Sequence, residues 1–136
     1  MNELSTHVMV ECIDCGHRTP FSVISYTCPN CSGQWREARY DYETIGRVLP
    51  ARVVERPNDL WRYREVLPVQ APNPLISMGE GGTPLIHAAN LGMMLGLRHL
   101  YIKDERQGPT GSFKDRQAAV SIAAIKEAGI TEAVLA

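Results

Sequence analysis

The chain has 136 residues, of which 44% are hydrophobic and 21% charged, a composition typical of globular proteins and not of disordered, fibrous or membrane-embedded chains. Its formal net charge of -1 implies no overall attraction to nucleic acid or to an anionic membrane. No stretch approaches the roughly 18 consecutive apolar residues of a membrane helix, and the N-terminus lacks the basic region and apolar core of a signal peptide. We therefore expect a cytoplasmic protein without a nucleic-acid or membrane partner.

Residues 8–45 are predicted to form a small metal-binding module. They contain two Cys-x-x-Cys pairs separated by twelve residues, namely Cys12 with Cys15 and Cys28 with Cys31. Each pair can aim two thiolates at one point, and the hairpin between them, which includes a β-prone run at 21–26, can bring the second pair opposite the first. The spacing is typical of a four-cysteine zinc ribbon. Four thiolates leave no open coordination position, so the zinc should be structural.

Other interpretations of this module were weighed. The cysteines could be four buried thiols or two disulfides, and His17 could replace one of them as a ligand, but the regular pairing and a reducing cytoplasm favour zinc. Zinc ribbons also occur in proteins that bind nucleic acid. Residues 8–45 carry three arginines against five acidic residues, so no basic face is expected. Packing against another domain or protein is the better interpretation.

Residues 46–82 are interpreted as a linker and N-terminal extension. Pro68, Pro72 and Pro74 frame a segment that should be extended or looped. Within this region, only residues 59–66 have a helical pattern.

From residue 83 onward the pattern becomes that of an α/β domain. The expected elements are an apolar run at 84–86, a helix at 88–95, a strand at 100–103, a polar loop at 104–111, a helix at 112–128 and a buried strand at 133–136. This alternation predicts a parallel sheet covered by helices on both faces. Two strands cannot complete such a sheet, so we expect residues 83–136 to begin a longer catalytic domain. The apolar residues of the second helix, and Met93, Met94 and Leu97, should lie in its core.

A lysine lies at the predicted start of the helix at 112–128. Ser112 suits the N-cap, with Asp115 three residues later as in a capping box, which places Lys114 in the first turn. The helix macrodipole disfavours a cation there and favours a neutral amine with a lowered pKa. A neutral amine is the form that makes an imine with an aldehyde. The alternative is a solvated surface lysine.

Two motifs resemble those of fold-type II pyridoxal-phosphate enzymes, the tryptophan synthase β-like group. The first, Gly111-Ser112-Phe113-Lys114-Asp115-Arg116, is similar to their Ser-x-Lys-Asp/Asn-Arg signature, in a form most similar to threonine synthases. The second, Gly79-Glu80-Gly81-Gly82-Thr83-Pro84-Leu85, is similar to a Gly-Glu-Gly-x-Thr-Pro-Leu segment of threonine synthases. Some threonine synthases also have an N-terminal cysteine ribbon, so the resemblance extends over about residues 8–136. The later glycine loop that cups the cofactor phosphate in the family lies outside these residues.

The resemblance implies that Lys114 binds pyridoxal 5'-phosphate as an imine, with Phe113 beside the cofactor, and later serves as a base. The implied activity is that of a carbon–oxygen lyase acting on phosphates, which converts O-phospho-L-homoserine and water to L-threonine and phosphate in threonine biosynthesis. A homodimer is also implied, and these 136 residues alone should be inactive. Cysteate synthase, threonine/serine dehydratase and a non-catalytic zinc-ribbon module are the alternatives. Arg106 is a candidate for binding an anionic substrate group.

Overall fold

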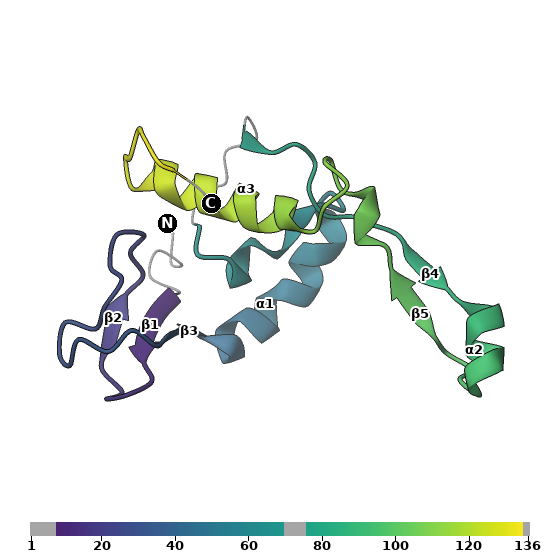
Figure 1. The fold of residues 1–136 in the computed structure, drawn as a ribbon, viewed down its shortest axis with the longest axis horizontal. Helices are drawn as coiled ribbons and strands as arrows, with labels where there is room; N and C mark the ends of the chain where they lie inside the picture. Colours follow the sequence, from purple (N-terminus) through teal and green to yellow (C-terminus); the bar gives the residue numbers. More distant parts are fainter. Residues whose placement is uncertain (1–7, 70–75, 135–136) are drawn as a thin grey trace.

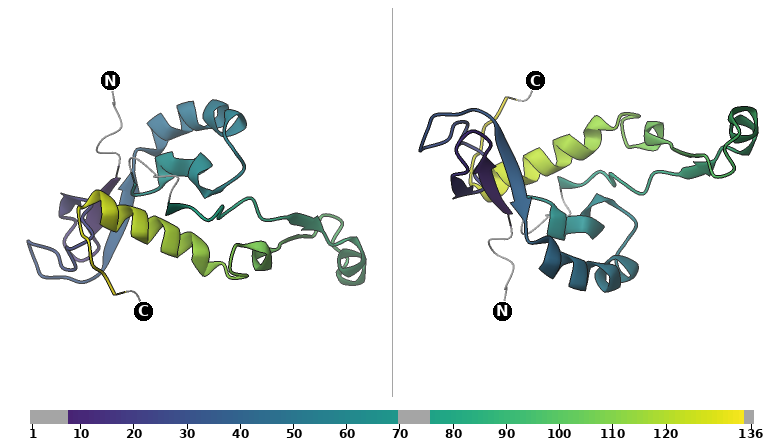
Figure 2. Two further views of the ribbon diagram at one scale, coloured as in Figure 1. Left: turned by 90° about the horizontal axis from the view of Figure 1, so that it is seen from above. Right: turned by 90° about the horizontal axis from the view of Figure 1, so that it is seen from below.

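The computed structural model describes residues 8–69 and 76–134. Figure 1 shows an N-terminal sheet, a central group of helices and an arm that projects away from both. The views from above and below in Figure 2 agree that the last helix lies across the centre and that the arm stands apart from the sheet. None of the helices in the described ranges is long and apolar enough to cross a membrane.

The N-terminal sheet has three antiparallel strands in the order β2-β1-β3. They are β1 (Val8–Cys12), β2 (Arg18–Pro20) and β3 (Arg36–Tyr40). The prediction of a strand at 21–26 is wrong, because the chain turns there. Strand β2 ends at Pro20, which lacks the N–H that would continue the ladder.

Two helices follow and are joined by a buried ion cluster. Helix α1 spans Tyr42–Glu55. The prediction that only residues 59–66 of the segment 46–82 are helical is therefore wrong. Pro50 lies inside α1 and breaks the usual helical pattern of the sequence. The 3-10 helix η1 (Leu60–Val66) confirms the helical prediction. The Glu65 carboxylate, 2% exposed, binds Arg56 at 2.6 Å and Arg52 at 3.0 Å and so connects η1 to α1.

The projecting arm consists of β4 (Leu85–His87), α2 (Ala89–Leu95) and β5 (Tyr101–Lys103). The predicted helix and strand are confirmed here, but β4 and β5 pair antiparallel with each other. Residues 133–134 form no strand, while 135–136 lie outside the described residues. Helices and strands therefore alternate as expected, but the described residues form no parallel sheet. The short helix α2 connects β4 to β5, and these two strands pair only with each other among the described residues.

The core lies between α3 (Lys114–Glu127) and the segment after η1. Val69, Ala123 and Ala124 are buried together, and they are packed by Val23, Trp61, Ile76 and Val120. The predicted helix at 112–128 is confirmed to within two residues, but Ala119, Ala123 and Ala124 are its only buried residues.

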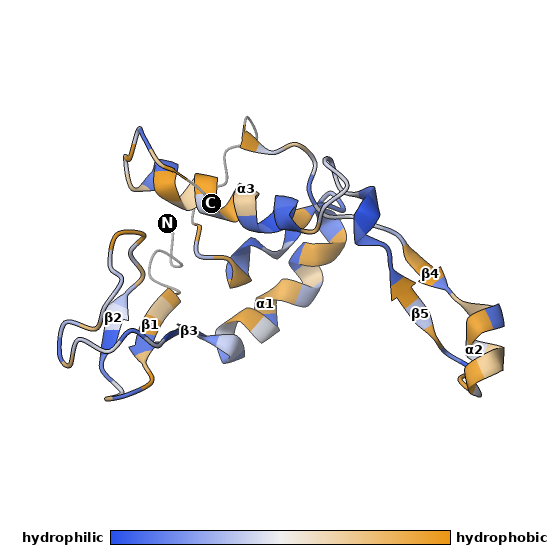
Figure 3. Cartoon of the chain, in the orientation of Figure 1, coloured by the Kyte–Doolittle hydropathy of each residue, from blue (hydrophilic) through white to orange (hydrophobic). Residues whose placement is uncertain are grey.

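The arm carries many hydrophobic residues, as the colouring in Figure 3 shows, and several of them are exposed. Met93 is 79% exposed, Met94 83% and Leu97 50%, so the expectation that they are core residues is wrong for this structure. The physical reason is that no layer within the described residues covers them.

Candidate functional site

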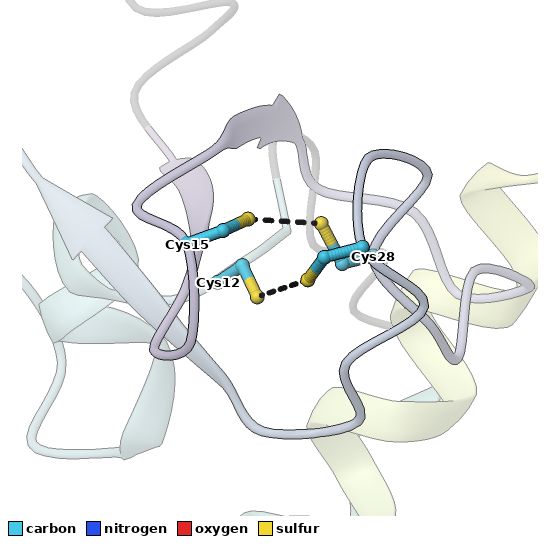
Figure 4. Close-up of side chains that lie close together, drawn as sticks. Cys12, Cys15 and Cys28 are labelled. Atoms are coloured by element: carbon cyan, nitrogen blue, oxygen red, sulfur yellow. Dashed lines mark hydrogen bonds between the residues drawn. The ribbon is translucent and has the colours of Figure 1, made fainter.

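The four cysteines come together in one cluster within the N-terminal module. Their Sγ atoms all lie within 4.8 Å of one another. The Sγ atoms of Cys12 and Cys31 are 3.6 Å apart, as are those of Cys15 and Cys28 (Figure 4). Zinc with tetrahedral bonds of about 2.3 Å holds sulfurs about 3.8 Å apart. The cluster therefore fits a four-thiolate zinc ion.

The same geometry bears on the alternatives for the cysteines. All four are free, so neither pair is a disulfide. His17 is not among the grouped side chains, and its backbone carbonyl instead accepts a hydrogen bond from the N–H of Cys12 at 2.9 Å.

The two Cys-x-x-Cys turns share one backbone pattern. The N–H of Cys12 donates to the carbonyl five residues later, and the N–H of Gly16 donates back to Cys12 at 2.9 Å. The N–H of Cys28 likewise donates to the carbonyl five residues later, and the N–H of Ser32 donates back to Cys28 at 2.9 Å. Gly16 and Ser32 both adopt a positive φ, of 71° and 62°. Glycine adopts this conformation readily and serine rarely, so the second turn is the more constrained of the two.

Hydrogen bonds within the cluster move the pKa values of two of its thiols in opposite directions. The backbone of His17, together with the Asn30 side chain, lowers the pKa of Cys15 to about 6. The backbone of Gly33 acts to lower the pKa of Cys31, but the adjacent Cys15 and Cys12 outweigh it and raise the pKa to about 12. Four adjacent thiols oppose their joint ionisation, and a divalent cation removes that opposition. The donor set is thus suited to a metal.

Lys114 is the first residue of α3 and is exposed. Within the described residues its amine makes no hydrogen bond or ion pair. The predicted N-cap is shifted, because Phe113 occupies that position and Ser112 Oγ accepts only the N–H of Lys114, at 3.2 Å. The predicted capping box is wrong as well. The Asp115 carboxylate turns back to the loop and accepts the N–H of Thr110 at 2.9 Å and its hydroxyl.

The residue after Asp115 is also anchored. The Arg116 guanidinium binds Glu105 through Nε at 2.8 Å and Nη2 at 2.9 Å. Arg116, and then the Thr83 hydroxyl, lower the pKa of Glu105 to about 2. Sequence reasoning missed Thr83 and Glu105 as members of the site, because the contact spans segments far apart in the chain and no periodic pattern marks it.

Arg106, the candidate anion-binding residue, is already paired. Its guanidinium binds the buried Asp104 carboxylate at 2.8 and 2.9 Å, which lowers the pKa of Asp104 to about 2. The positive charge of Arg106 is therefore largely balanced.

The glycine-rich segment packs closely against the backbone before η1. Gly81 and Gly82 have φ of +98° and +60°, and a Cβ on Gly82 would lie 2.1 Å from the carbonyl oxygen of Asn58. The N–H of Leu60 donates to the carbonyl of Glu80 at 2.6 Å. These glycines allow two backbone segments to meet, which is a structural task distinct from phosphate binding.

The residues present fit pyridoxal phosphate through the lysine. The Lys114 amine is unpaired, and the neighbouring Phe113 ring is 66% exposed. A cavity of about 540 Å³ lies at the other end of α3, lined by Ile122, Ile125, Lys126, Gly129, Ile130, Thr131 and Ala133. Lys114 does not line this cavity.

Comparisons with known proteins show what the chain is similar to. Residues 76–136 match the family described as pyridoxal-phosphate dependent enzyme. The threonine synthase of Methanocaldococcus jannaschii is 41% identical over 124 residues, which cover 90% of this chain and 30% of that protein. The threonine synthase of Methanosarcina acetivorans is 36% identical over 121 residues, which cover 89% of this chain and 29% of that protein. The threonine synthase of Halalkalibacterium halodurans is 47% identical over 70 residues, which cover 52% of this chain and 20% of that protein.

The chain thus spans about 30% of the length of the first two of these curated relatives. No solved structure matches it. The matched region includes both the glycine-rich segment and Lys114. Through residues 76–136, the chain is similar to the pyridoxal-phosphate-dependent enzyme family.

Proposed function

We propose that this chain is the N-terminal part of a threonine synthase-like lyase that converts O-phospho-L-homoserine and water to L-threonine and phosphate. The observation that carries the proposal is its similarity to two threonine synthases over 90% and 89% of its length. Matches of that extent reach beyond the 61 residues of the family match into the N-terminal half of the chain. The remainder of the catalytic domain would supply the phosphate-binding loop and the residues that select the substrate.

In this proposal Lys114 has two tasks. Its amine holds pyridoxal phosphate, which when bound supplies an electron sink for negative charge developing on the substrate. Lys114 Nζ would also act as the base that moves protons at the substrate α-carbon and the neighbouring carbons. The exposed Phe113 ring offers an apolar flank beside that amine, and Asp115 and Arg116 hold the turn from which it projects.

The zinc ribbon has a structural task in this proposal. Cys12, Cys15, Cys28 and Cys31 would hold the ion and leave no open coordination position for catalysis. We propose that the enzyme works in the cytoplasm, where thiols stay reduced and available to a metal. We also propose that it is a homodimer.

The test uses the intact protein, in which we propose that this chain is followed by the rest of the catalytic domain. The protein is mixed with pyridoxal phosphate, reduced with borohydride and mapped by mass spectrometry. We expect the adduct on Lys114 and phosphate release from O-phospho-L-homoserine. Lys114→Arg should abolish both while zinc content is unchanged, and Lys126→Arg on the same helix is the matched control.

Two results would contradict the proposal. An adduct on another lysine would remove Lys114 from the site. Deamination of serine or threonine without phosphate release from O-phospho-L-homoserine would assign the protein to the dehydratases. The 136-residue chain alone should form no threonine in the same assay.

A further inference from the structure

The first turn of α3 is anchored on both residues that follow the lysine. Asp115 accepts two hydrogen bonds from Thr110 in the preceding loop. Arg116 binds Glu105. The Lys114 amine, in contrast, makes no hydrogen bond or ion pair with any residue that the structure describes. The turn is therefore fixed through its neighbours, and the lysine is left available.

The Arg116 anchor is a closed ring of three side chains. Arg116 makes two hydrogen bonds to Glu105, at 2.8 and 2.9 Å, and a third from Nη2 to Thr83 Oγ1 at 3.2 Å. The Thr83 hydroxyl donates in turn to Glu105 Oε1 at 2.7 Å. A bidentate contact between a guanidinium and a carboxylate is both strong and directional. Thr83 is buried, and the Arg116 and Glu105 side chains are 31% and 30% exposed.

Each member of the ring comes from a different segment. Thr83 precedes β4, Glu105 begins the 3-10 helix η3 (Glu105–Gln107) after β5, and Arg116 lies in α3. The Lys103 ammonium also donates to the Thr83 carbonyl. Glu105 makes the shortest contacts of the ring, to Thr83 at 2.7 Å and to Arg116 at 2.8 and 2.9 Å. It therefore joins the base of the arm to the first turn of α3.

We propose that Glu105 is a positioning residue for Lys114, because by holding Arg116 and Thr83 it fixes the turn from which the Lys114 amine projects. This inference rests on the function proposed for Lys114. Glu105 itself contacts no reacting group in that proposed function. Its carboxylate is ionised throughout the neutral range, since the adjacent Arg116 lowers its pKa to about 2.

The test is Glu105→Gln in the intact protein with pyridoxal phosphate. Glutamine keeps the size of the side chain but removes the charge and one of the two oxygens that accept from Arg116. Misplacement of a reacting group slows the chemical steps more than it weakens substrate binding. We expect kcat for phosphate release to fall about tenfold with KM within about twofold of the original. Borohydride trapping on Lys114 should slow in parallel.

Substitutions at Thr83 separate positioning from a general loss of structure. Thr83→Val removes the hydroxyl with little change in volume and should reproduce the effect of Glu105→Gln. Thr83→Ser restores the hydroxyl and should rescue both kcat and trapping. Glu65→Gln, which removes another buried carboxylate bound to arginines, is the control and should lower stability without changing the trapping rate.

A measurement without cofactor completes the test. Amide hydrogen exchange of residues 115–120 in the 136-residue chain should be faster in Glu105→Gln, while exchange at 124–127 should be unchanged. If the original protein is not trapped on Lys114, the proposed function fails, and the exchange result still reports on the ring. Unchanged exchange, or unchanged kcat and trapping in both Glu105→Gln and Thr83→Val, would overturn the inference.

Discussion

The cysteine cluster and the lysine loop differ in how much of each site the chain builds. All four candidate metal ligands lie between Cys12 and Cys31, and their Sγ atoms meet within 4.8 Å. The ring behind Lys114 joins Thr83 to Arg116, 33 residues apart, while the lysine amine itself remains exposed. A site made from neighbouring residues is completed by local turns. A site made from several segments is anchored by this chain but completed only by further contacts.

The largest expected effect tests whether the cysteine cluster is complete. Cys28→Ser removes a buried ligand, and structural zinc contributes on the order of 10 kcal/mol to the folding of small zinc-dependent modules. We expect the variant chain to lose zinc in native mass spectrometry and residues 8–40 to lose amide protection. Ser22→Ala in the same hairpin is the control. Full zinc occupancy in Cys28→Ser would show that the four thiolates are not the site.

The next effect tests the close backbone contact between the glycine-rich segment and Asn58. Gly82→Ala would place a Cβ 2.1 Å from the Asn58 carbonyl oxygen at a φ of +60°. Strain and displacement together should cost about 3 kcal/mol. Gly79→Ala is the matched control, because Gly79 has a φ of +86° but no atom within 4 Å of its Cβ position, so only about 1 kcal/mol of strain is expected. Urea unfolding measures the free energy of unfolding of both variants. Equal losses in Gly82→Ala and Gly79→Ala would show that the close contact with Asn58 is not the cause of the destabilisation.

A smaller effect concerns the charged connection between α1 and η1. Arg56 chiefly, with Arg52, lowers the pKa of Glu65 from 4.5 to about 2 against the opposing effect of burial. A depressed carboxyl pKa stabilises the fold above about pH 5, and the contribution is lost as the pH falls toward 2. The free energy of unfolding should therefore drop by up to about 3 kcal/mol over that range.

Glu65→Gln isolates this contribution. The variant should be less stable at neutral pH, because Arg56 is left without its carboxylate, and its stability should depend less on pH between 5 and 2. Glu43→Gln, which removes an exposed partner of Arg47, should leave the pH dependence intact. Identical pH profiles for Glu65→Gln and the original chain would contradict the assignment.

The same contrast explains what could be predicted from sequence. The metal set follows from spacing alone, and α2 and α3 follow from apolar periodicity with Gly96 and Gly129 as stops. Helix α1 was missed because Pro50 interrupts an otherwise helical stretch.

Contacts between distant segments left no such pattern. The bond from Arg116 to Glu105 depends on how the arm folds back, and the exposure of Met93 and Met94 depends on which layers surround them. Neither is encoded in a local window of residues. The expected core was therefore wrong for the arm, although the helix at 88–95 and the strand at 100–103 were right.

One core contact has a consequence for biosynthesis. Val23, in the hairpin between the two cysteine pairs, packs against the core cluster of Val69, Ala123 and Ala124. A ribosome that adds about 5–20 residues per second needs about 5–18 s to travel the 92 positions from Cys31 to Ala123. All four thiols are synthesised before the alanines of that cluster. If the four thiols hold a metal ion as proposed, the ribbon can fold around it before the helix that carries Lys114 has been synthesised.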